Sequence, residues 1–200
     1  MLDPNALETE IRQLEPWQQV AFSAALTERM FQNFALFSRL MEFGDLNRMR
    51  TVLDGVWDEL AQTGSKLNYE VQLGHVDDNL IDTDEFDMFG AVAARDAMLA
   101  LYSTLMCKLE KEASEAVAVS QLSYETVSSY IEFAEADDQM SDEEVLLMIN
   151  KHDMTLDEDA FQAEVLGQLK GAKQNAATIA ALRMLGKNEG FSNIGISDEE

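Results

Sequence analysis

The side chains that could do chemistry in this chain are few and lie in apolar surroundings. Glu28, Arg29 and Asn33 fall within one apolar stretch, and Asp96 falls within a second, AVAARDAMLAL. A buried charge without a partner is very costly, so any of these groups that are buried must be paired. One interpretation is a polar pocket in which Glu28, Arg29 and Asp96 surround a small molecule. The other is a structural ion pair between Arg29 and a carboxylate, because structural pairs resemble functional sites in this way.

A metal site is not predicted. Di-iron sites in helical bundles need Glu-x-x-His on two helices, so that a carboxylate and an imidazole share one face. The two histidines are His75 and His152, and the residues three positions before them are Gln72 and Ile149. A zinc site would need more ligands than one cysteine and two distant histidines supply. We therefore expect neither a metal nor a cofactor.

Two acidic stretches, beginning at Asp153 and Asp82, superficially resemble calcium loops. The sixth position of such a loop is glycine, which permits a sharp turn, but here it is Glu158 or Asp87. The stretch from Thr155 to Glu158 has the form of a helix-capping box, which explains the same acidic residues. The sequence has no dinucleotide-binding, phosphate-loop or nucleophile-elbow motif. No catalytic residue is predicted.

The charge balance argues against two classes of partner. The chain has 14 Lys and Arg against 38 Asp and Glu, a net charge of −24. Such a surface repels phosphate backbones and anionic lipid headgroups, so we expect neither nucleic acid nor membrane binding. The basic residues are dispersed and form no patch in the sequence. The acidic surface either keeps the protein soluble or binds a basic protein.

The sequence also indicates a compartment. Cys107 lies among apolar residues and is expected to be a buried, inert thiol. The chain opens Met1-Leu2-Asp3, without the basic and apolar regions of a secretory signal. Its longest uncharged apolar runs fall short of the roughly 18 residues that a membrane span requires. We expect a soluble, cytoplasmic protein.

The element that must position these residues is one long helix, Pro16–Met41. Proline suits the first turn of a helix, where its missing N–H is no loss. The apolar residues of this stretch, Phe22, Phe31 and Phe37 among them, point to every side. A helix that is apolar all round is wrapped by others. The sequence therefore predicts an all-α, single-domain helical bundle built round a buried central helix.

Helical spacing predicts the remaining elements. Gly90 would lie inside one of them, at a kink or a close helix crossing. The acidic interval 132–164 could be a disordered linker, but its two capping boxes favour a folded corner. No stretch has the alternation of a β-strand. The predicted helices cover about residues 5–14, 46–62, 68–75, 85–111, 114–136, a short run at 145–149 and 156–187, all in one domain, 1–200, with an extended tail from about residue 190.

Several segments resemble one family along nearly the whole chain. They are WQQVAFSAALTERMFQNFALF at 17–37, FGD at 43–45, LDGVWDEL at 53–60, KLNYEVQL at 66–73, DEFDMFG at 84–90, RDA at 95–97, MSDEE at 140–144 and SNIGI at 192–196. In these the chain is similar to the YjaG-like family of uncharacterised bacterial proteins, which carries a domain-of-unknown-function label. The resemblance implies a single cytoplasmic helical domain and brings no activity. Family members tend to have Tyr-Pro-Asn-Tyr where this chain has FQNF at 31–34, which weakens any proposal of chemistry there.

The resemblance extends the set of polar residues. It adds Asp45, Asp54, Asp87 and Asn193 to the residues already singled out, and the SNIGI match predicts that residues 191–196 dock against the bundle. From this set the candidate polar site is Glu28, Arg29, Asn33, Asp45, Asp96 and Asn193.

Two functions follow from these observations. The first is a non-enzymatic protein-interaction module with a strongly acidic surface, whose unknown protein partner is basic, with self-association into a homodimer left open. The alternative is a small-molecule-binding protein or enzyme with a polar pocket around Glu28, Arg29 and Asp96.

Overall fold

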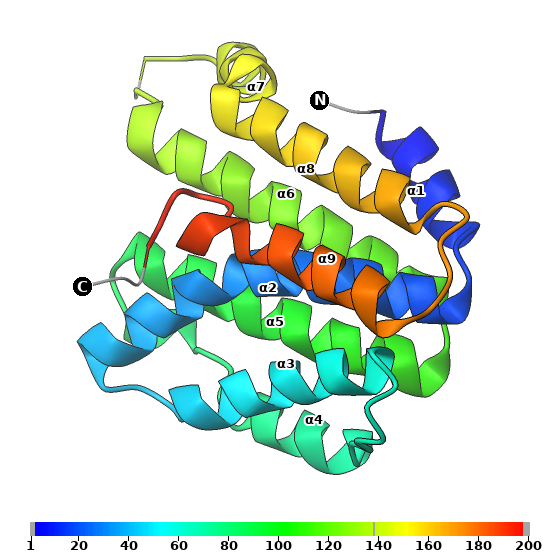
Figure 1. The fold of residues 1–200 in the computed structure, drawn as a ribbon. Coiled ribbons are helices and arrows are strands. Elements are labelled where there is room, and N and C mark those ends of the chain that lie inside the picture. The colour runs from blue at the N-terminus through cyan, green and yellow to red at the C-terminus, as the bar shows by residue number, and fades with distance from the viewer. Residues whose placement is uncertain (1–2, 138, 198–200) are drawn as a thin grey trace.

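A computed structural model describes residues 3–137 and 139–197, which fold into a bundle of helices (Figure 1). Within these residues there is no β-strand, and one isolated antiparallel bridge joins Phe191 to Ser197. This confirms the all-α fold. The α-helices are α1 (Pro4–Arg12), α2 (Pro16–Met41), α3 (Leu46–Leu60), α4 (Tyr69–Asp77), α5 (Phe89–Glu110), α6 (Ala113–Glu135), α7 (Asp142–Lys151), α8 (Asp153–Leu169) and α9 (Ala176–Lys187), with short 3-10 helices η1 (Thr83–Glu85) and η2 (Asn188–Gly190).

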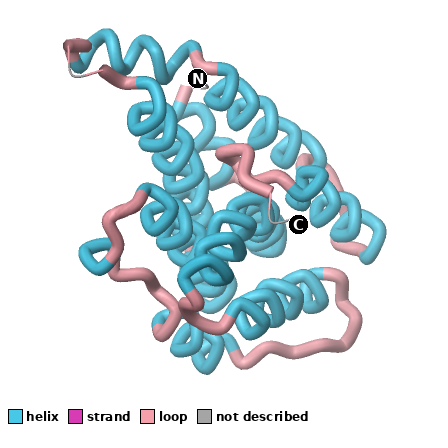
Figure 2. Tube along the Cα trace, turned by 90° about the vertical axis from the view of Figure 1, so that its left-hand side faces the viewer, coloured by secondary structure: helices cyan, strands magenta, loops and turns pink. Residues whose placement is uncertain are grey.

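Helix α2 is the centre of the bundle, as its sequence predicts. It begins at Pro16 behind a capping box formed by Glu15 and Gln18. Phe22 and Phe34 are fully buried although they lie on different sides of the helix. Helices α3, α5, α6, α8 and α9 all pack against α2, which explains why no side of it remains polar. Figure 2 shows the bundle turned by 90°, with the C-terminal segment lying among the helices.

The helix predicted over 85–111 begins later than expected. Residues 83–85 form η1, Phe86 is extended, and α5 starts at Phe89. Gly90 is therefore the second residue of α5 and marks no kink. A Cβ atom placed on it would meet only the Met88 sulfur, at 3.9 Å, so the prediction of a close helix crossing there is also wrong.

The helix predicted over 156–187 is two helices. Helix α8 ends at Leu169, and a turn containing Gly171 at φ 71° leads to α9. The side chain of Asn175 caps α9 by accepting hydrogen bonds from the backbone N–H groups of Ala177 and Thr178. The sequence carries a local signal for this break, since Gly171 and Asn175 are of the types that end and begin helices, but the apolar spacing continues on both sides of them.

The acidic corner is folded. The capping box of Ser141 and Glu144 starts α7, as predicted. The second capping box is wrong: α8 starts at Asp153 with His152 as its cap, and the Thr155 hydroxyl donates a hydrogen bond to the backbone carbonyl of Ile149. Asp138, within the same acidic interval, lies outside the described residues.

The C-terminal segment folds back onto the bundle. Ser192, Asn193 and Ile194 are buried, which agrees with the docking predicted for residues 191–196. The segment is a closed turn rather than an extended tail, since the backbone N–H of Ser192 donates to the carbonyl of Ile196 at 2.8 Å. Residue 193 thereby reaches the interior beside α2 and α6.

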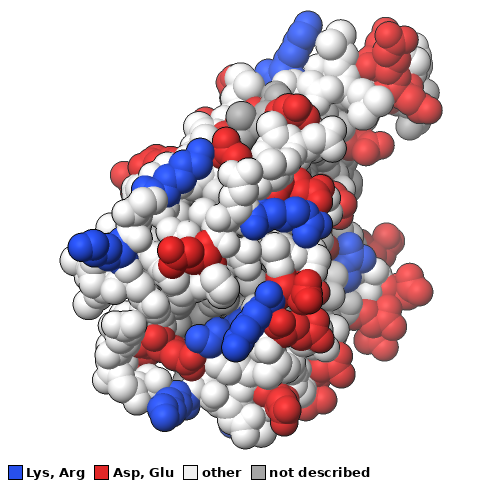
Figure 3. Space-filling model, turned by 90° about the vertical axis from the view of Figure 1, so that its right-hand side faces the viewer, with Lys and Arg blue, Asp and Glu red and all other residues white. Residues whose placement is uncertain are grey.

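On the face of the molecule drawn in Figure 3, Lys and Arg side chains lie among Asp and Glu side chains. Among the helices that the structure describes, none combines the length and the apolar composition needed to cross a membrane.

Candidate functional site

Glu28, Arg29 and Asp96 do not come together. Glu28 and Arg29 are neighbours on α2, but successive helical residues point about 100° apart. Glu28 faces α3 and α9, whereas Arg29 faces α8. Asp96, on α5, bonds to Arg95 and Thr126 instead. The structure thus divides the predicted polar site into separate clusters, and the pocket expected around these three residues is not formed.

The Glu28 carboxylate is held by two residues of α3. Arg50 of α3 donates to both of its oxygens, from Nη1 to Oε1 at 2.9 Å and from Nη2 to Oε2 at 2.8 Å. The indole Nε1 of Trp57 donates to Oε2 at 2.8 Å. Arg50 also lies over the Phe31 ring, 4.7 Å from its centroid. A two-pronged guanidinium–carboxylate pair of this kind is strong and directional, so Glu28 is fixed in position.

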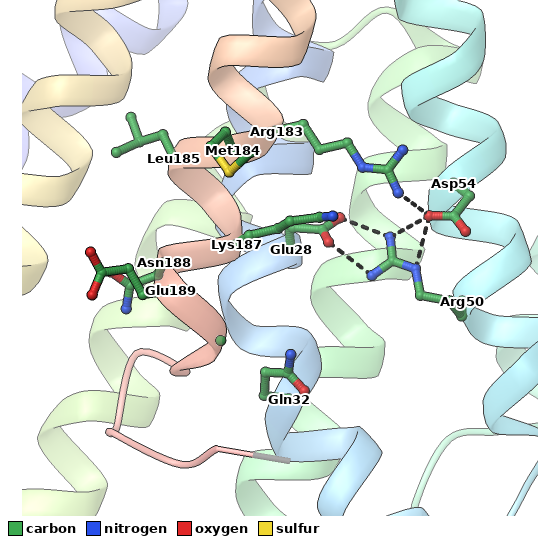
Figure 4. A pocket seen from close by; sticks show the side chains of 11 residues that line it. Glu28, Gln32, Arg50, Asp54, Arg183, Met184, Leu185, Lys187, Asn188 and Glu189 are labelled. Atoms are coloured by element: carbon green, nitrogen blue, oxygen red, sulfur yellow. Dashed lines mark hydrogen bonds and ion pairs between the residues drawn. The ribbon is translucent and has the colours of Figure 1, made fainter. Parts of the chain in front are cut away.

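Asp54 extends this cluster to α9. Its Oδ1 accepts from the Nε of Arg50 at 2.9 Å and from the Nη2 of Arg183, which comes from α9. Figure 4 shows the four side chains Glu28, Arg50, Asp54 and Arg183 joined in one chain of ion pairs. The cluster therefore connects α2, α3 and α9.

A cavity of about 890 Å³ opens beside this cluster. We call it the α9 pocket, because most of its wall belongs to α9 and η2. Its charged residues are balanced, with three cations and three carboxylates. The lining residues are Glu28, Gln32, Arg50, Asp54, Arg183, Met184, Leu185, Lys187, Asn188, Glu189 and Gly190.

Arg29 takes part in a buried pair on the other side of α2. Its Nη1 lies 3.2 Å from the Oε2 of Glu158 on α8, and its guanidinium lies over the Phe161 ring at 4.4 Å. Arg29 is 7% exposed and Glu158 is fully buried. The pair of Arg29 with a carboxylate that the sequence suggested is therefore present, and it ties α8 to the central helix.

Other buried polar groups surround Glu158. Its Oε1 accepts from the Ser123 hydroxyl at 2.7 Å and from the Gln162 amide at 2.8 Å. Asn193 donates to the Ser123 carbonyl at 3.3 Å, and Asn33 donates to the Asn193 side chain at 3.0 Å. The network joins α2, α6, α8 and the C-terminal segment and so includes Asn33 and Asn193 from the predicted set.

Sequence reasoning missed Glu158 as a member of this network, because its acidic stretch also fits a capping box. A signal was present nonetheless. Glu158, Phe161, Gln162 and Val165 follow the i, i+3, i+4, i+7 spacing of one helix face, and all four are buried. A glutamate and a glutamine on the apolar face of a helix indicate a buried polar network.

Asp45 has a local role. Its carboxylate accepts from the backbone N–H of Arg48 at 2.9 Å and thereby caps α3. Its own backbone N–H donates to the side chain of Asn79 at 2.7 Å. Asp45 is exposed, and these contacts assign it to the start of α3 rather than to either polar cluster.

Asp96 is a buried carboxyl group with a perturbed titration. Its Oδ1 accepts from Arg95 at 2.8 Å, and its Oδ2 accepts from the Thr126 hydroxyl at 3.0 Å. Burial raises the pKa of Asp96, and the hydrogen bonds and charge of Arg95 and the bond from Thr126 oppose that rise only in part. Ionised Asp96 is therefore less favourable in the folded chain than in the unfolded chain.

The substitution Asp96→Asn is expected to remove a pH dependence of stability. Below the ordinary Asp pKa of about 3.9, a carboxyl group whose pKa is raised by folding is protonated in both states and favours the folded protein. This stability is lost as pH rises through the pKa of the folded state, because the group must then ionise where it is buried. The free energy of unfolding of Asp96→Asn, relative to that of wild type, should therefore rise with pH between the pKa of the unfolded state and that of the folded state, and then level off. Urea unfolding at a series of pH values measures the difference. The exposed Asp58→Asn is the control for loss of one charge, and a difference that falls with rising pH would contradict the expectation.

Nucleophilic chemistry has little support in these clusters. The thiol of Cys107 is 1% exposed, and burial raises its pKa to about 11. The thiolate is the reactive form, so this thiol is unreactive at neutral pH. Among the residues that the structure describes, no group of three or more His, Cys, Asp or Glu side chains could hold a metal ion.

A further feature lies where α5 begins and α6 ends, around a hollow of about 560 Å³. The Phe89 ring stacks on Phe133 with centroids 5.1 Å apart and lies 5.5 Å from the Tyr130 ring. Phe133 is 68% exposed and Met88 is 48% exposed. No motif or spacing in the sequence indicates this patch. We call its apolar and aromatic members, Met88, Phe89, Tyr130, Phe133 and Ile196, the aromatic surface.

Comparison with known proteins identifies the family. The family model described as "Protein of unknown function (DUF416)" matches residues 6–197. The uncharacterized protein YjaG of Escherichia coli (strain K12) is 34% identical over 194 residues, which cover 96% of each chain. The YjaG protein of Salmonella typhimurium is 32% identical over 198 residues, or 98% of each chain.

A solved structure has the same fold. The crystal structure of a DUF416 family protein from Shewanella baltica OS155 matches with a TM-score of 0.87 and 30% identity. The match covers 95% of this chain and 97% of that one. The resemblance to YjaG-like proteins seen in the sequence is confirmed, and the chain belongs to the DUF416 family of proteins of unknown function.

Proposed function

We propose that this protein is a non-enzymatic protein-interaction module that binds a basic partner at the aromatic surface. The observation that carries the proposal is the exposure of Phe133, 68% accessible although it stacks on Phe89. Water-exposed clusters of large apolar side chains mark interaction sites. Aromatic residues also contribute much of the binding energy in protein interfaces.

The surroundings of the aromatic surface suggest the charge of the partner. The segments 84–90 and 130–137, which supply most of the surface, contain no Lys or Arg. A partner with Lys or Arg around an apolar side chain would complement them. The exposed carboxylates in these segments are Asp84, Glu85, Asp87, Glu132, Glu135 and Asp137.

The same carboxylates disfavour pairing of two copies through this surface. Like charges brought together across an interface cost free energy and suppress the wrong partner. A homodimer remains a prediction for other faces of the molecule. We place the protein in the bacterial cytoplasm, where its lone Cys107 would stay reduced.

A synthetic amphipathic helix, with leucine on one face and lysine on the other, tests the surface. Phe133→Ser is expected to weaken its binding about tenfold or more, because loss of a central aromatic anchor costs about 2 kcal/mol. Fluorescence anisotropy of the labelled peptide measures the change. Binding should also weaken as salt is raised, since charges more than about 10 Å apart are screened at 0.1 M.

Two controls separate site from charge. Leu109→Ser removes a side chain that is 43% exposed at the far end of α5 and should leave binding unchanged. A peptide of the same composition with its leucines scattered should bind more weakly than the amphipathic one. Circular dichroism should show that Phe133→Ser and Leu109→Ser are folded. If Phe133→Ser then binds the peptide with the same affinity as wild type, the proposal is refuted. In an extract of the native host, the partner captured by wild type should be lost with Phe133→Ser and kept with Leu109→Ser.

A further inference from the structure

The α9 pocket contains one cation, Lys187, that is unpaired among the described residues, and a second, Arg183, that is paired on one side only. Lys187 lines the pocket and has no hydrogen bond or ion pair within the described part of the chain. Arg183 donates from Nη2 to Asp54, while its Nε is buried and has no hydrogen-bond partner among the described residues. The Arg183 side chain as a whole is 28% exposed and lines the pocket, so a ligand there can contact it beside its bond to Asp54.

Arg183 and Lys187 are placed to act together. They lie four residues apart on α9 and so share one face of that helix. Figure 4 shows both side chains on the pocket side of α9, with Gln32 entering from α2. By contrast, Arg50 already donates to both Glu28 and Asp54 and has little left to offer a ligand.

The part of α9 that carries Arg183 and Lys187 is packed tightly against α2. Helix α9 lies so close to α2 that a Cβ atom on Gly186 would be 2.8 Å from the backbone oxygen of Ala25. The pocket rim is made by Asn188, Glu189 and Gly190, which have φ values of 46°, 55° and 91°. Left-handed backbone at residues other than glycine costs free energy and is concentrated at functional sites.

We propose that the α9 pocket binds a small ligand through an anionic group, a carboxylate or a phosphate, held between Arg183 and Lys187. Guanidinium and ammonium groups are the usual partners of such anions. Glu28 and Asp54 oppose the anion less than unpaired carboxylates would, because Arg50 donates to both of them. This site is independent of the aromatic surface, so either proposal can fail alone.

Titration of the ¹⁵N-labelled protein with sodium phosphate, and separately with sodium acetate, tests the site. Ionic strength is held constant with sodium chloride. We expect saturable NMR shifts of the backbone amides of residues 183–190 and of the Arg183 Nε–H. Lys187→Gln should weaken binding of the anion that saturates the site about tenfold, the effect of losing one charge-assisted hydrogen bond. Comparing the two anions distinguishes a phosphate site from a carboxylate site.

The variants distinguish a loss of anion binding from a loss of folding. Lys187→Gln removes no ion pair present in the structure, whereas Arg183→Gln also removes the contact with Asp54 and serves as a second test. Lys173→Gln removes the same charge from the loop before the other end of α9 and should leave the affinity unchanged. Shifts that fail to saturate with both anions would overturn the proposal. So would equal affinities of Lys187→Gln and Lys173→Gln.

Discussion

Glu158→Gln is expected to lower the free energy of unfolding by about 3–5 kcal/mol. The substitution keeps the shape of the side chain but removes its charge, so Arg29 would be buried without an opposing carboxylate. Breaking one half of a buried ion pair costs this much because the remaining charge cannot be hydrated. Glu158 is fully buried and Arg29 is 7% exposed, so water cannot replace the lost partner. Urea unfolding at pH 7 measures the loss.

The matched control is Glu8→Gln on α1. Glu8 accepts from Arg12 at 2.8 Å, but both side chains are substantially exposed, and pairs of this kind contribute less than about 1 kcal/mol. The double variant Arg29→Met with Glu158→Leu should regain much of the stability lost in Glu158→Gln, since no charge is then left unpaired. A loss from Glu158→Gln no larger than that from Glu8→Gln would show that the buried pair contributes little.

Gly186→Ala is expected to destabilise the protein by about 2 kcal/mol, although alanine is the better helix former. The new Cβ would lie 2.8 Å from the Ala25 carbonyl oxygen and 3.0 Å from the Glu28 Cβ. The first of these is backbone of the central helix and cannot turn away, so α9 must shift. Overpacking of this kind costs about 1–3 kcal/mol. Thermal and urea unfolding measure the change.

Gly74→Ala provides the control because the same atom is added where there is room. Gly74 lies within α4, and a Cβ there would meet no atom within 4 Å. Gly74→Ala should stabilise the protein by up to about 1 kcal/mol, because alanine has the higher helix propensity. If the two substitutions change the free energy of unfolding in opposite directions, the effect of the α2–α9 contact is distinguished from that of helix propensity. A stabilising Gly186→Ala would mean that α9 can move off α2 at little cost.

The candidate site could be predicted only in part. The sequence identified Glu28, Arg29 and Asp96 as polar groups in apolar surroundings, and all three are buried. It could not show that Glu28 faces Arg50 and Trp57 while Arg29 faces Glu158. Neighbouring residues on a helix point in different directions, and the partners of Glu28 and Arg29 come from positions 22 to 129 residues away.

The aromatic surface illustrates the same limit. Phe89 and Phe133 belong to different helices, and the sequence gives no reason to place them in contact. Phe133 lies two positions from the buried Ile131 and so on the opposite side of α6, which agrees with its exposure but does not indicate which ring it meets. Only the crossing of α5 and α6 brings the two rings to 5.1 Å.

By itself the sequence determined the helical class, the central place of α2 and the excess of negative charge, because periodicity and composition are local properties. Proline at the first turn and apolar residues on every side were sufficient to mark α2. The tertiary structure decided which polar groups meet and where Gly186 permits α9 to approach α2. These outcomes depend on packing between segments far apart in the chain, and no local pattern encodes the distance between them.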